Sequence, residues 1–312
     1  MHNTVDMTLW TGRKDEGEDL RWHQHVVPWL EKDQQPGIAL LGVASDEGVK
    51  RNQGRIGAAA GPDAIRQRLA NQAYHLQRPI YDVGNLCCEQ GNLETLQQEQ
   101  AVLVHQLLEQ SHFPLLLGGG HEIAVGSFLG LERHLSPSRT AAPIAIINFD
   151  AHFDLREATE PTSGTPFLQI AKHCQAKGIP FHYCCLGISE VANTSALFTQ
   201  AEQLGAEYLK DEDLNNWQLP QIEVKLTEFI RPCRALYLSI DLDVLPAATA
   251  PGVSAPAARG VPLATLEQLL TVIKSVSQDR LKIADIAEYN PHYDIDGRTA
   301  RVAARLCHLL AR

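Results

Sequence analysis

The sequence predicts an α/β fold in which a mostly parallel sheet carries helices on both faces. Short apolar segments rich in β-branched residues recur along the 312-residue chain, and segments with apolar residues three or four positions apart separate them. Strands that alternate with helices build parallel sheets, and such strands consist of continuous apolar runs because both of their faces are buried. No internal repeat, low-complexity tract or linker interrupts this alternation.

The apolar runs define the expected strands, which fall at 38–44, 79–84, 114–119, 143–150, 182–187, 235–241 and 281–288. The amphipathic segments define the expected helices, at 62–72, 93–111, 122–134, 165–177, 222–230, 263–277 and 298–311. The seven cysteines contain no CxxC pair, and two sets, Cys87–Cys88 and Cys184–Cys185, are adjacent. Adjacent strand residues point to opposite faces, so we expect reduced, mostly buried thiols.

Residues 1–35 precede the first expected strand and are polar. They carry Trp10, Trp22 and Trp29, which a disordered tail has no reason to contain. We therefore expect an N-terminal arm packed on the body, and a single metallohydrolase domain over 36–312.

Charge and hydropathy exclude several classes of partner. The formal net charge of −10 opposes binding to nucleic acid or to an anionic membrane surface, because both require a cationic footprint. No apolar run approaches the length that spans a bilayer, and the first residues lack a basic region followed by an apolar one. We expect a cytoplasmic protein.

Three of the expected strands end in residues that bind metals. NFDAHFDL (148–155) sets Asp150, His152 and Asp154 at alternate positions, which would share one face if the strand continued. LYLSIDLD (236–243) sets Asp241 and Asp243 two apart, and LLLGGGHE (115–122) delivers a histidine, His121, after three glycines. Ligands of parallel α/β sheets bind at the carboxyl ends of strands, where these side chains would meet.

Each motif alone has an ordinary structural explanation: a turn or cap for the first, a solvated strand edge for the second, and a tight turn or phosphate loop for the third. Their coincidence favours metal binding. Four clustered carboxylates repel one another by about several kcal/mol per close pair unless they are protonated or neutralised, and two divalent cations would neutralise them. Oxygen ligands with two imidazoles and no thiolate suit Mn²⁺ best, with Zn²⁺, Co²⁺ or Fe²⁺ as possible occupants and Ca²⁺ or Mg²⁺ less suited.

With these motifs the chain resembles the arginase/agmatinase (ureohydrolase) family over about residues 36–311. The resemblance rests on LGGGHEIAVGSFLG (117–130), INFDAHFD (147–154), SIDLDVLPAATAPGVSAPAARG (239–260), GRIGAAAGPDAIR (54–66) and AEYNP (287–291). It implies a three-layer α/β/α fold with a mostly parallel sheet of about eight strands, two Mn²⁺ per subunit, and a homo-oligomer, a trimer or hexamer. The family's acid that holds the amidine or guanidine head falls on Glu288, and its metal ligands fall on His121, Asp150, His152, Asp154, Asp241 and Asp243.

One departure from the family pattern bears on the substrate. Arginases and agmatinases carry a histidine after the DAHxD motif, whereas TSGTPF (162–167) places Ser163 there. The resemblance then implies the branch of the family that hydrolyses N-formimidoyl-L-glutamate to L-glutamate and formamide in histidine degradation. This small anionic amidine needs cationic donors, for which Arg156 and Arg55 are candidates and Arg51 and Arg259 further ones.

The same departure leaves the proton donor to the leaving amine open. Asp154, which can take a proton from the attacking water, is the candidate, and no arrangement around Ser163 favours it as a nucleophile. Three alternatives stay open. They are a ureohydrolase acting on agmatine or another guanidino compound, a two-metal phosphoesterase, whose motifs would run in the opposite chain order, and a non-catalytic relative, which would have damaged ligands.

Overall fold

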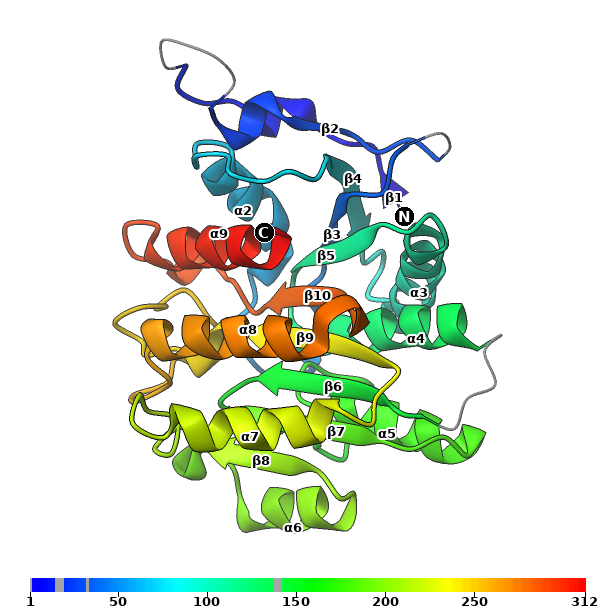
Figure 1. The fold of residues 1–312 in the computed structure, drawn as a ribbon, viewed down its shortest axis with the longest axis vertical. Helices are drawn as coiled ribbons and strands as arrows, with labels where there is room; N and C mark the ends of the chain where they lie inside the picture. The colour runs from blue at the N-terminus through cyan, green and yellow to red at the C-terminus, as the bar shows by residue number, and fades with distance from the viewer. Residues whose placement is uncertain (1, 15–19, 32–33, 137–141) are drawn as a thin grey trace.

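A ten-stranded sheet runs through the centre of the structure (Figure 1). The structure is a computed structural model that describes residues 2–14, 20–31, 34–136 and 142–312, and the strand count refers to these residues. The strands are β1 (His2–Asn3), β2 (Val26–Pro28), β3 (Ile38–Ala44), β4 (Ile80–Cys87), β5 (Phe113–Gly118), β6 (Ile144–Phe149), β7 (His182–Ile188), β8 (Glu207–Lys210), β9 (Ala235–Asp241) and β10 (Leu281–Ala287).

The strand order is β1-β4-β3-β5-β10-β9-β6-β7-β8, with β2 beside β4. Strand β1 pairs with β4 in antiparallel fashion, and the other pairings are parallel. The path from β4 to β8 therefore holds eight parallel strands, which confirms the expected sheet. Seven of these strands were predicted; the eighth, β8, lies at the edge and has no buried residue, so it lacks a continuous apolar run.

Helices cover both faces of the sheet and complete three layers (Figure 1). One face packs against α2 (Gly61–Leu69), α7 (Leu219–Ile230), α8 (Leu263–Ser277) and α9 (Arg298–Ala311). The other packs against α3 (Leu93–Glu109), α4 (Ala124–Leu135), α5 (Pro166–Lys177) and α6 (Ser195–Gln203). A short helix, α1 (Glu47–Arg51), follows β3, and 3-10 turns occur at Met7–Leu9, Trp22–Gln24, Ala58–Ala60, His121–Ile123, Glu190–Ala192, Leu242–Val244, Gln278–Arg280 and Pro291–Tyr293.

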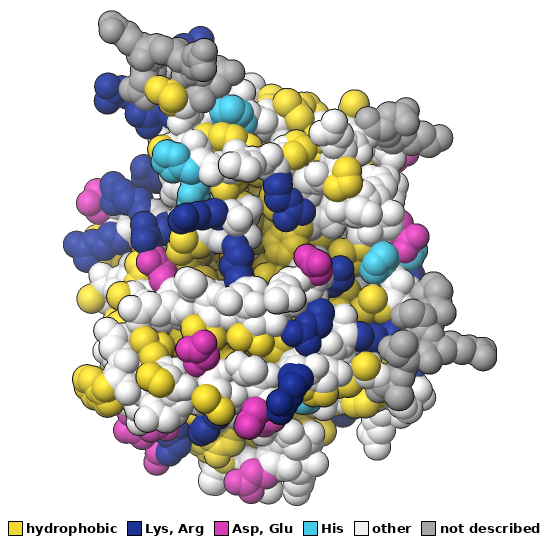
Figure 2. Space-filling model, in the orientation of Figure 1, with side chains coloured by type: hydrophobic (Ala, Val, Ile, Leu, Met, Phe, Trp, Pro, Cys, Tyr) yellow, Lys and Arg dark blue, Asp and Glu magenta, His cyan; other side chains and the backbone are white. Residues whose placement is uncertain are grey.

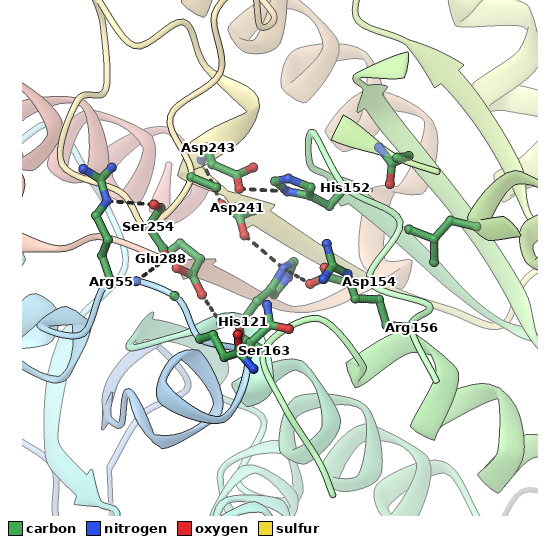
Figure 3. A pocket seen from close by; sticks show the side chains of 16 residues that line it. Arg55, His121, His152, Asp154, Arg156, Ser163, Asp241, Asp243, Ser254 and Glu288 are labelled. Atoms are coloured by element: carbon green, nitrogen blue, oxygen red, sulfur yellow. Dashed lines mark hydrogen bonds and ion pairs between the residues drawn. The ribbon is translucent and has the colours of Figure 1, made fainter. Parts of the chain in front are cut away.

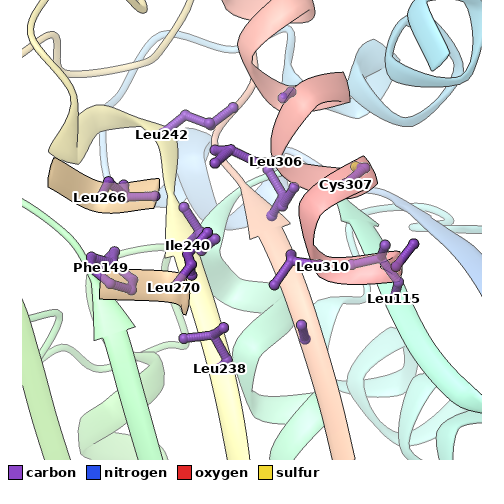
Figure 4. Close-up of a cluster of buried hydrophobic side chains, with 14 of the residues drawn as sticks. Leu115, Phe149, Leu238, Ile240, Leu242, Leu266, Leu270, Leu306, Cys307 and Leu310 are labelled. Carbon is purple, nitrogen blue, oxygen red and sulfur yellow. The ribbon is translucent and has the colours of Figure 1, made fainter. Parts of the chain in front are cut away.

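Two hydrophobic clusters, one on each face, hold the layers together. Leu238 and Ile240 of β9 contribute to the cluster that includes Leu270 of α8 (Figure 4), whereas Tyr237 of the same strand contributes to the opposite cluster. Cys184 and Cys185 of β7 divide in the same way, which confirms that they face different layers. All seven residues of β9 are buried, and its sequence is apolar apart from Ser239 and Asp241.

The differences from the predicted elements are small and have local causes. Helix α1 has only five residues, and α6 buries only Ala201, so neither presents a clear apolar stripe. The strands predicted at 143–150 and 281–288 end one residue earlier, at Phe149 and Ala287. Asp150 and Glu288 therefore lie just beyond the strands.

The three N-terminal tryptophans hydrogen-bond to distant parts of the chain. Trp10 Nε1 donates to Asp82 Oδ2 at 2.6 Å, and Trp22 Nε1 donates to His308 Nδ1 at 3.1 Å. Trp29 Nε1 donates to Gln110 Oε1 at 3.2 Å. The division into an arm over 1–35 and one domain over 36–312 stays a prediction.

Helix α9 shows how surface charge is arranged. Its inner side is buried, and basic side chains gather over it on the face drawn in Figure 2. Two of these cations are paired: Arg305 Nη2 donates to Glu267 Oε2 at 2.8 Å, and Arg301 Nη1 lies 3.9 Å from Asp296 Oδ2. Within the described residues, no helix has both the length and the apolar character needed to cross a membrane.

Candidate active site

Four neighbouring strands bring the predicted site residues to one edge of the sheet. In sheet order these strands are β5, β10, β9 and β6, although they are far apart in sequence. His121 follows β5, Glu288 follows β10, Asp241 ends β9, and Asp150 follows β6. Figure 3 shows the side chains of His121, Asp241 and Glu288 pointing toward one another. Parallel strands end at the same edge, which is why the motif residues meet there.

Turns, rather than strand alternation, aim the paired side chains. The expectation that Asp150, His152 and Asp154 share the face of a strand is wrong, because β6 ends at Phe149. Asp150 Oδ1 instead accepts a hydrogen bond from the His152 backbone N–H at 2.7 Å. Asp241 Oδ1 accepts one from the Asp243 backbone N–H at 2.8 Å in the same way. The two-residue spacing of both motifs is therefore that of an aspartate turn.

Three carboxylates surround the ring of His121. Its Nδ1 atom lies 3.1 Å from Asp150 Oδ2, 3.0 Å from Asp154 Oδ2 and 3.1 Å from Asp241 Oδ2. Nevertheless this buried nitrogen makes no hydrogen bond with any described residue. Oxygens that crowd a nitrogen without accepting from it are arranged like ligands around a shared cation.

A second group is built around His152. Its Nδ1 atom lies 3.0 Å from Asp243 Oδ2 and 3.5 Å from Asp150 Oδ1. Two sets, His121 with Asp150 and Asp241, and Asp150 with His152 and Asp243, each have ligand atoms within 4.8 Å of one another and could hold a metal ion. Asp150 belongs to both sets, so one carboxylate connects the two positions.

The electrostatics of this cluster fit a bound cation. Burial, reinforced by the charge of Asp150, raises the pKa of Asp154 to about 6. Burial and the charges of Asp243 and Asp150 also raise the pKa of Asp241 well above its ordinary value. Among the described residues, only imidazoles lie within ion-pair distance of these carboxylates. The cluster therefore lacks a fixed cation of its own, and a metal would supply it.

A buried hydrogen-bond chain fixes the ring of His121 from behind. Its Nε2 atom lies 2.9 Å from Ser239 Oγ, and that hydroxyl donates to Asp285 Oδ1 at 2.6 Å. Tyr237 and Ser127 donate to the other oxygen of Asp285, at 2.5 and 2.8 Å. Because the Ser239 proton is committed to Asp285, its oxygen accepts from Nε2–H. The tautomer that results turns an unprotonated Nδ1 toward the carboxylates.

Glu288 brings a second buried atom without a hydrogen-bond partner to the site, in addition to His121 Nδ1. Its Oε1 atom accepts from the His121 backbone N–H at 2.9 Å, whereas its buried Oε2 atom has no hydrogen-bond partner among the described residues. Burial, followed by the charge of Glu122, raises the pKa of Glu288 to about 8. Glu288 and Asp154 both adopt left-handed backbone conformations, with φ of 65° and 51°. Such strain in residues other than glycine is concentrated at functional sites.

These groups form the floor of a cavity of about 320 Å³, and Arg55 and Arg156 lie on opposite sides of it (Figure 3). Arg156 makes no side-chain hydrogen bond or ion pair with the described residues. Arg55 is anchored, because its Nε and Nη2 atoms donate to the carbonyls of Ser254 and Val253 at 2.8 and 2.6 Å. Ser163 also lines the cavity.

Two further arginines suggested by the sequence lie elsewhere. Arg51 pairs with Glu94 at 2.9 Å and with Glu47 at 3.3 Å, so its charge is already neutralised. Arg259 lines a different cavity, beside Trp217. Neither lines the cavity over the acidic cluster. The pair with Glu47 is local, within helix α1, whereas the pair with Glu94 depends on the packing of distant segments, which the local sequence does not reveal.

Sequence reasoning also missed the residues that support the site. Asn193, in the connection after β7, donates to the carbonyls of Ala151 and Ser189 at 2.8 and 2.9 Å. Its Oδ1 atom accepts from the Phe153 backbone N–H at 3.1 Å, so it holds the turn that carries His152. No motif marks Asn193. The sequence gives a weak indication of Ser239 and Asp285, because each is a polar residue in the middle of a mostly apolar strand.

Comparison with known proteins agrees with this architecture. The model of the arginase family matches residues 36–311. The formimidoylglutamases of Aeromonas hydrophila and Chromobacterium violaceum are 54% and 52% identical to the chain, over 99% of this chain in both cases and 99% and 98% of their own lengths.

Solved structures share the fold. The formimidoylglutamase from Bacillus subtilis superimposes with a TM-score of 0.81 at 24% identity, covering 96% of this chain and 94% of that one. The Trypanosoma cruzi formiminoglutamase with Mn²⁺ gives a TM-score of 0.77 at 21% identity, covering 88% and 93%. The family match spans most of the chain and the curated relatives align over nearly all of it, so the chain belongs to the arginase family.

Proposed function

We propose that this chain is a formimidoylglutamase, which hydrolyses N-formimidoyl-L-glutamate to L-glutamate and formamide in histidine degradation. The observation that carries the proposal is the pairing of a buried acidic cluster with two arginines on opposite sides of one cavity. The substrate combines a cationic amidine with two carboxylates, so it requires both kinds of group. The names of the relatives that are more than half identical to the chain support the same activity.

We also propose that the acidic cluster binds two Mn²⁺ per subunit. The ligands would be His121, Asp150, His152, Asp154, Asp241 and Asp243. The donor set contains carboxylate oxygens and imidazole nitrogens without thiolates, which suits Mn²⁺. The two ligand groups that share one aspartate support two positions rather than one. When bound, the metals would act as Lewis acids toward water and substrate.

Glu288 would bind the amidine end of the substrate. Its orphan Oε2 atom is buried beside the cluster and can accept a charge-assisted hydrogen bond from an amidinium N–H. Its other oxygen is fixed by the backbone of His121, so the carboxylate cannot rotate freely. Glu288 would therefore hold the formimidoyl carbon in one orientation over the floor of the cavity.

The carboxylates of the substrate would meet Arg156, Arg55 and Ser163. Arg156 is the main candidate, because its guanidinium is not committed to any described partner. Backbone carbonyls hold Arg55, and its guanidinium carbon lies 4.3 Å from the centroid of the Tyr293 ring. Arg55 would therefore present a positive charge at a fixed position on the rim of the cavity. Ser163 would add a hydroxyl donor from the loop after β6.

Asp154 would carry the proton through the reaction. The attacking water forms a bond to the formimidoyl carbon, and Asp154 accepts the water's proton. The bond between this carbon and the glutamate nitrogen then breaks, and the proton passes to that nitrogen. Formamide and L-glutamate leave. The closeness of Asp154 to His121, at 3.0 Å, places this carboxylate at the cluster rather than at the rim.

A substrate comparison tests the proposal. Purified chain incubated with MnCl₂ should release formamide and glutamate in equal amounts from N-formimidoyl-L-glutamate, and chelator treatment should abolish the release. Urea from agmatine or arginine, without formamide, would instead establish a guanidino-specific ureohydrolase. Phosphate release from a model phosphoester would favour the phosphoesterase alternative. No product from any substrate by a manganese-loaded chain would indicate a non-catalytic relative.

Two expectations about the whole protein stay predictions. We propose a cytoplasmic location, and we propose a trimer or hexamer on the basis of the family resemblance. Light scattering coupled to size-exclusion chromatography would determine the number of subunits. Expression of the tagged full chain followed by fractionation would test the location.

A further inference from the structure

Helices α3 and α4 pack closely enough to fix the side chains at their C-terminal ends. Figure 1 shows the two helices side by side. A Cβ atom at Gly126 of α4 would lie 2.5 Å from the Gln100 side chain, and one at Gly130 would lie 2.6 Å from Val104. These glycines let the backbones approach and set the register between the helices. His134, one turn after Gly130, is thereby placed against the last turns of α3.

Three potential metal ligands meet at this end of the helix pair. His105 and Glu109 are four residues apart on α3, so they lie on one helix face. Together with His134 they offer ligand atoms that all lie within 4.8 Å of one another. His134 Nδ1 is 2.6 Å from Glu109 Oε1, and the rings of the two histidines are 6.3 Å apart between centroids.

One of these histidines has an unused nitrogen. The Nδ1 atom of His105 is buried and has no hydrogen-bond partner among the described residues. Glu109 and His134 also lie in the last turns of α3 and α4, where the helix dipoles place partial negative charge. An orphan imidazole nitrogen favours a cation here, together with a second imidazole and a carboxylate that both lie in the last turns of their helices.

We propose that His105, Glu109 and His134 form a peripheral binding site for a divalent transition metal of the Zn²⁺ class. Two imidazoles and one carboxylate are a donor set for Zn²⁺, Ni²⁺ or Cu²⁺, whereas the oxygen-rich cluster in the active site suits Mn²⁺. Both helices run from the carboxyl edge of the sheet to its amino edge, so the peripheral site lies opposite the active site. It does not depend on the proposed hydrolase activity.

Binding at this site would join the last turn of α4 to that of α3. A ligand that binds only the folded chain raises the free energy of unfolding by an amount that grows with the logarithm of its concentration over its dissociation constant. The peripheral site would therefore give a zinc-dependent rise in melting temperature that comes from the helix pair. It would leave the geometry at the opposite edge of the sheet unchanged.

The test compares four full-length proteins kept saturated with MnCl₂ and dialysed against ZnCl₂. Wild type should bind about one Zn²⁺ more per chain than His105→Ala or His134→Ala. His173→Ala is the matched control. His173 is 28% exposed and lies 3.6 Å from Glu132, much as the 26% exposed His134 lies beside Glu109. His173 belongs to no three-residue ligand group among the described residues, so this variant should bind like wild type.

Exchange of zinc into the active-site cluster would affect all four proteins equally and would cancel in the comparison. The zinc-dependent rise in melting temperature should also be lost in His134→Ala. A fifth protein, Glu109→Gln, keeps the size of the exposed side chain and should show a weakened rise. Equal zinc binding by wild type, His105→Ala and His134→Ala would overturn the proposal. Circular dichroism would verify that each variant is folded.

Discussion

Two groups of buried charged side chains, the Arg66–Asp82 pair and the acidic cluster at the carboxyl edge, are stabilised in different ways. Arg66 donates from Nε and Nη2 to both oxygens of Asp82, at 2.9 Å each, and Trp10 donates to the same carboxylate at 2.6 Å. This pair is neutral and fully hydrogen-bonded. The cluster at the carboxyl edge has four aspartates and two histidines, with no lysine or arginine paired to them among the described residues.

The difference indicates which cluster is structural and which binds a ligand. A bidentate arginine–carboxylate pair satisfies its own charge and hydrogen bonds, so nothing needs to be added. Carboxylates that surround an imidazole nitrogen without hydrogen-bonding to it remain incomplete until a cation arrives. Substitutions in the two clusters should therefore differ in their dependence on metal.

The largest effect is expected from Asp241→Asn. The variant removes one ligand and one negative charge, so manganese binding should weaken and formamide release should fall by about 10³-fold, equivalent to several kcal/mol of lost transition-state stabilisation. The metal-free chain should not lose stability, because repulsion with Asp150 and Asp243 is relieved. Steady-state kinetics and thermal unfolding in chelator would measure both. If the metal-free variant has a much lower melting temperature than metal-free wild type, the account of this cluster is contradicted.

The second prediction concerns the neutral pair. Asp82→Asn leaves the buried guanidinium of Arg66 without its counter-charge, and breaking one partner of such a pair costs about 3–5 kcal/mol of folding free energy. Urea titrations with and without Mn²⁺ should show the same loss. A loss that manganese restores would mean that the two clusters are coupled, and the contrast between them would fail.

The third prediction separates substrate binding from metal binding. Arg156→Ala should raise the KM for N-formimidoyl-L-glutamate by about 10- to 100-fold, since hydrogen bonds to charged groups contribute about 1.5–3 kcal/mol. The number of bound metals should not change. Arg156→Lys is the matched control: it keeps the charge without the planar fork and should lie between alanine and wild type. An unchanged KM in the alanine variant would exclude Arg156 from the binding site.

The smallest effect is expected behind the metal ligands. Ser239→Ala removes the acceptor that holds His121 Nε2, and manganese affinity should fall by about tenfold, the low end for groups that orient a metal ligand. Ser127→Ala is the control, because Ser127 contacts Asp285 but not His121. Isothermal titration with MnCl₂ would measure both. Equal losses in the two variants would show that the effect comes from Asp285 alone and not from the orientation of the ring.

The fold was largely predictable because its strands are buried on both faces and therefore stand out as apolar runs. Edge strand β8 and helix α6 were missed for the opposite reason, since few of their side chains are buried. The candidate site residues stand out in the sequence because His121, Asp150 and Asp241 each follow or end such a run. The orientation of the aspartate side chains could not be predicted, because aspartate turns and strand alternation produce the same two-residue spacing.

Residues whose role depends on distant partners could not be found from the sequence. Arg51 differs from Arg156 chiefly by its pairing with Glu94, which lies 43 positions away and is not evident from the local sequence. Asn193 supports the turn at His152 from a different connection of the fold. In each case the decisive contact joins segments at least 40 positions apart, and only the folded chain brings them together.

The central claim is that two divalent metals complete the acidic cluster and make it active. A titration of metal-free chain with MnCl₂, followed by formamide release from N-formimidoyl-L-glutamate and by bound manganese, tests this most directly. Activity should be absent without metal and should reach its maximum at two bound ions per chain. Full activity in chelator, or two bound ions without formamide release, would contradict the account.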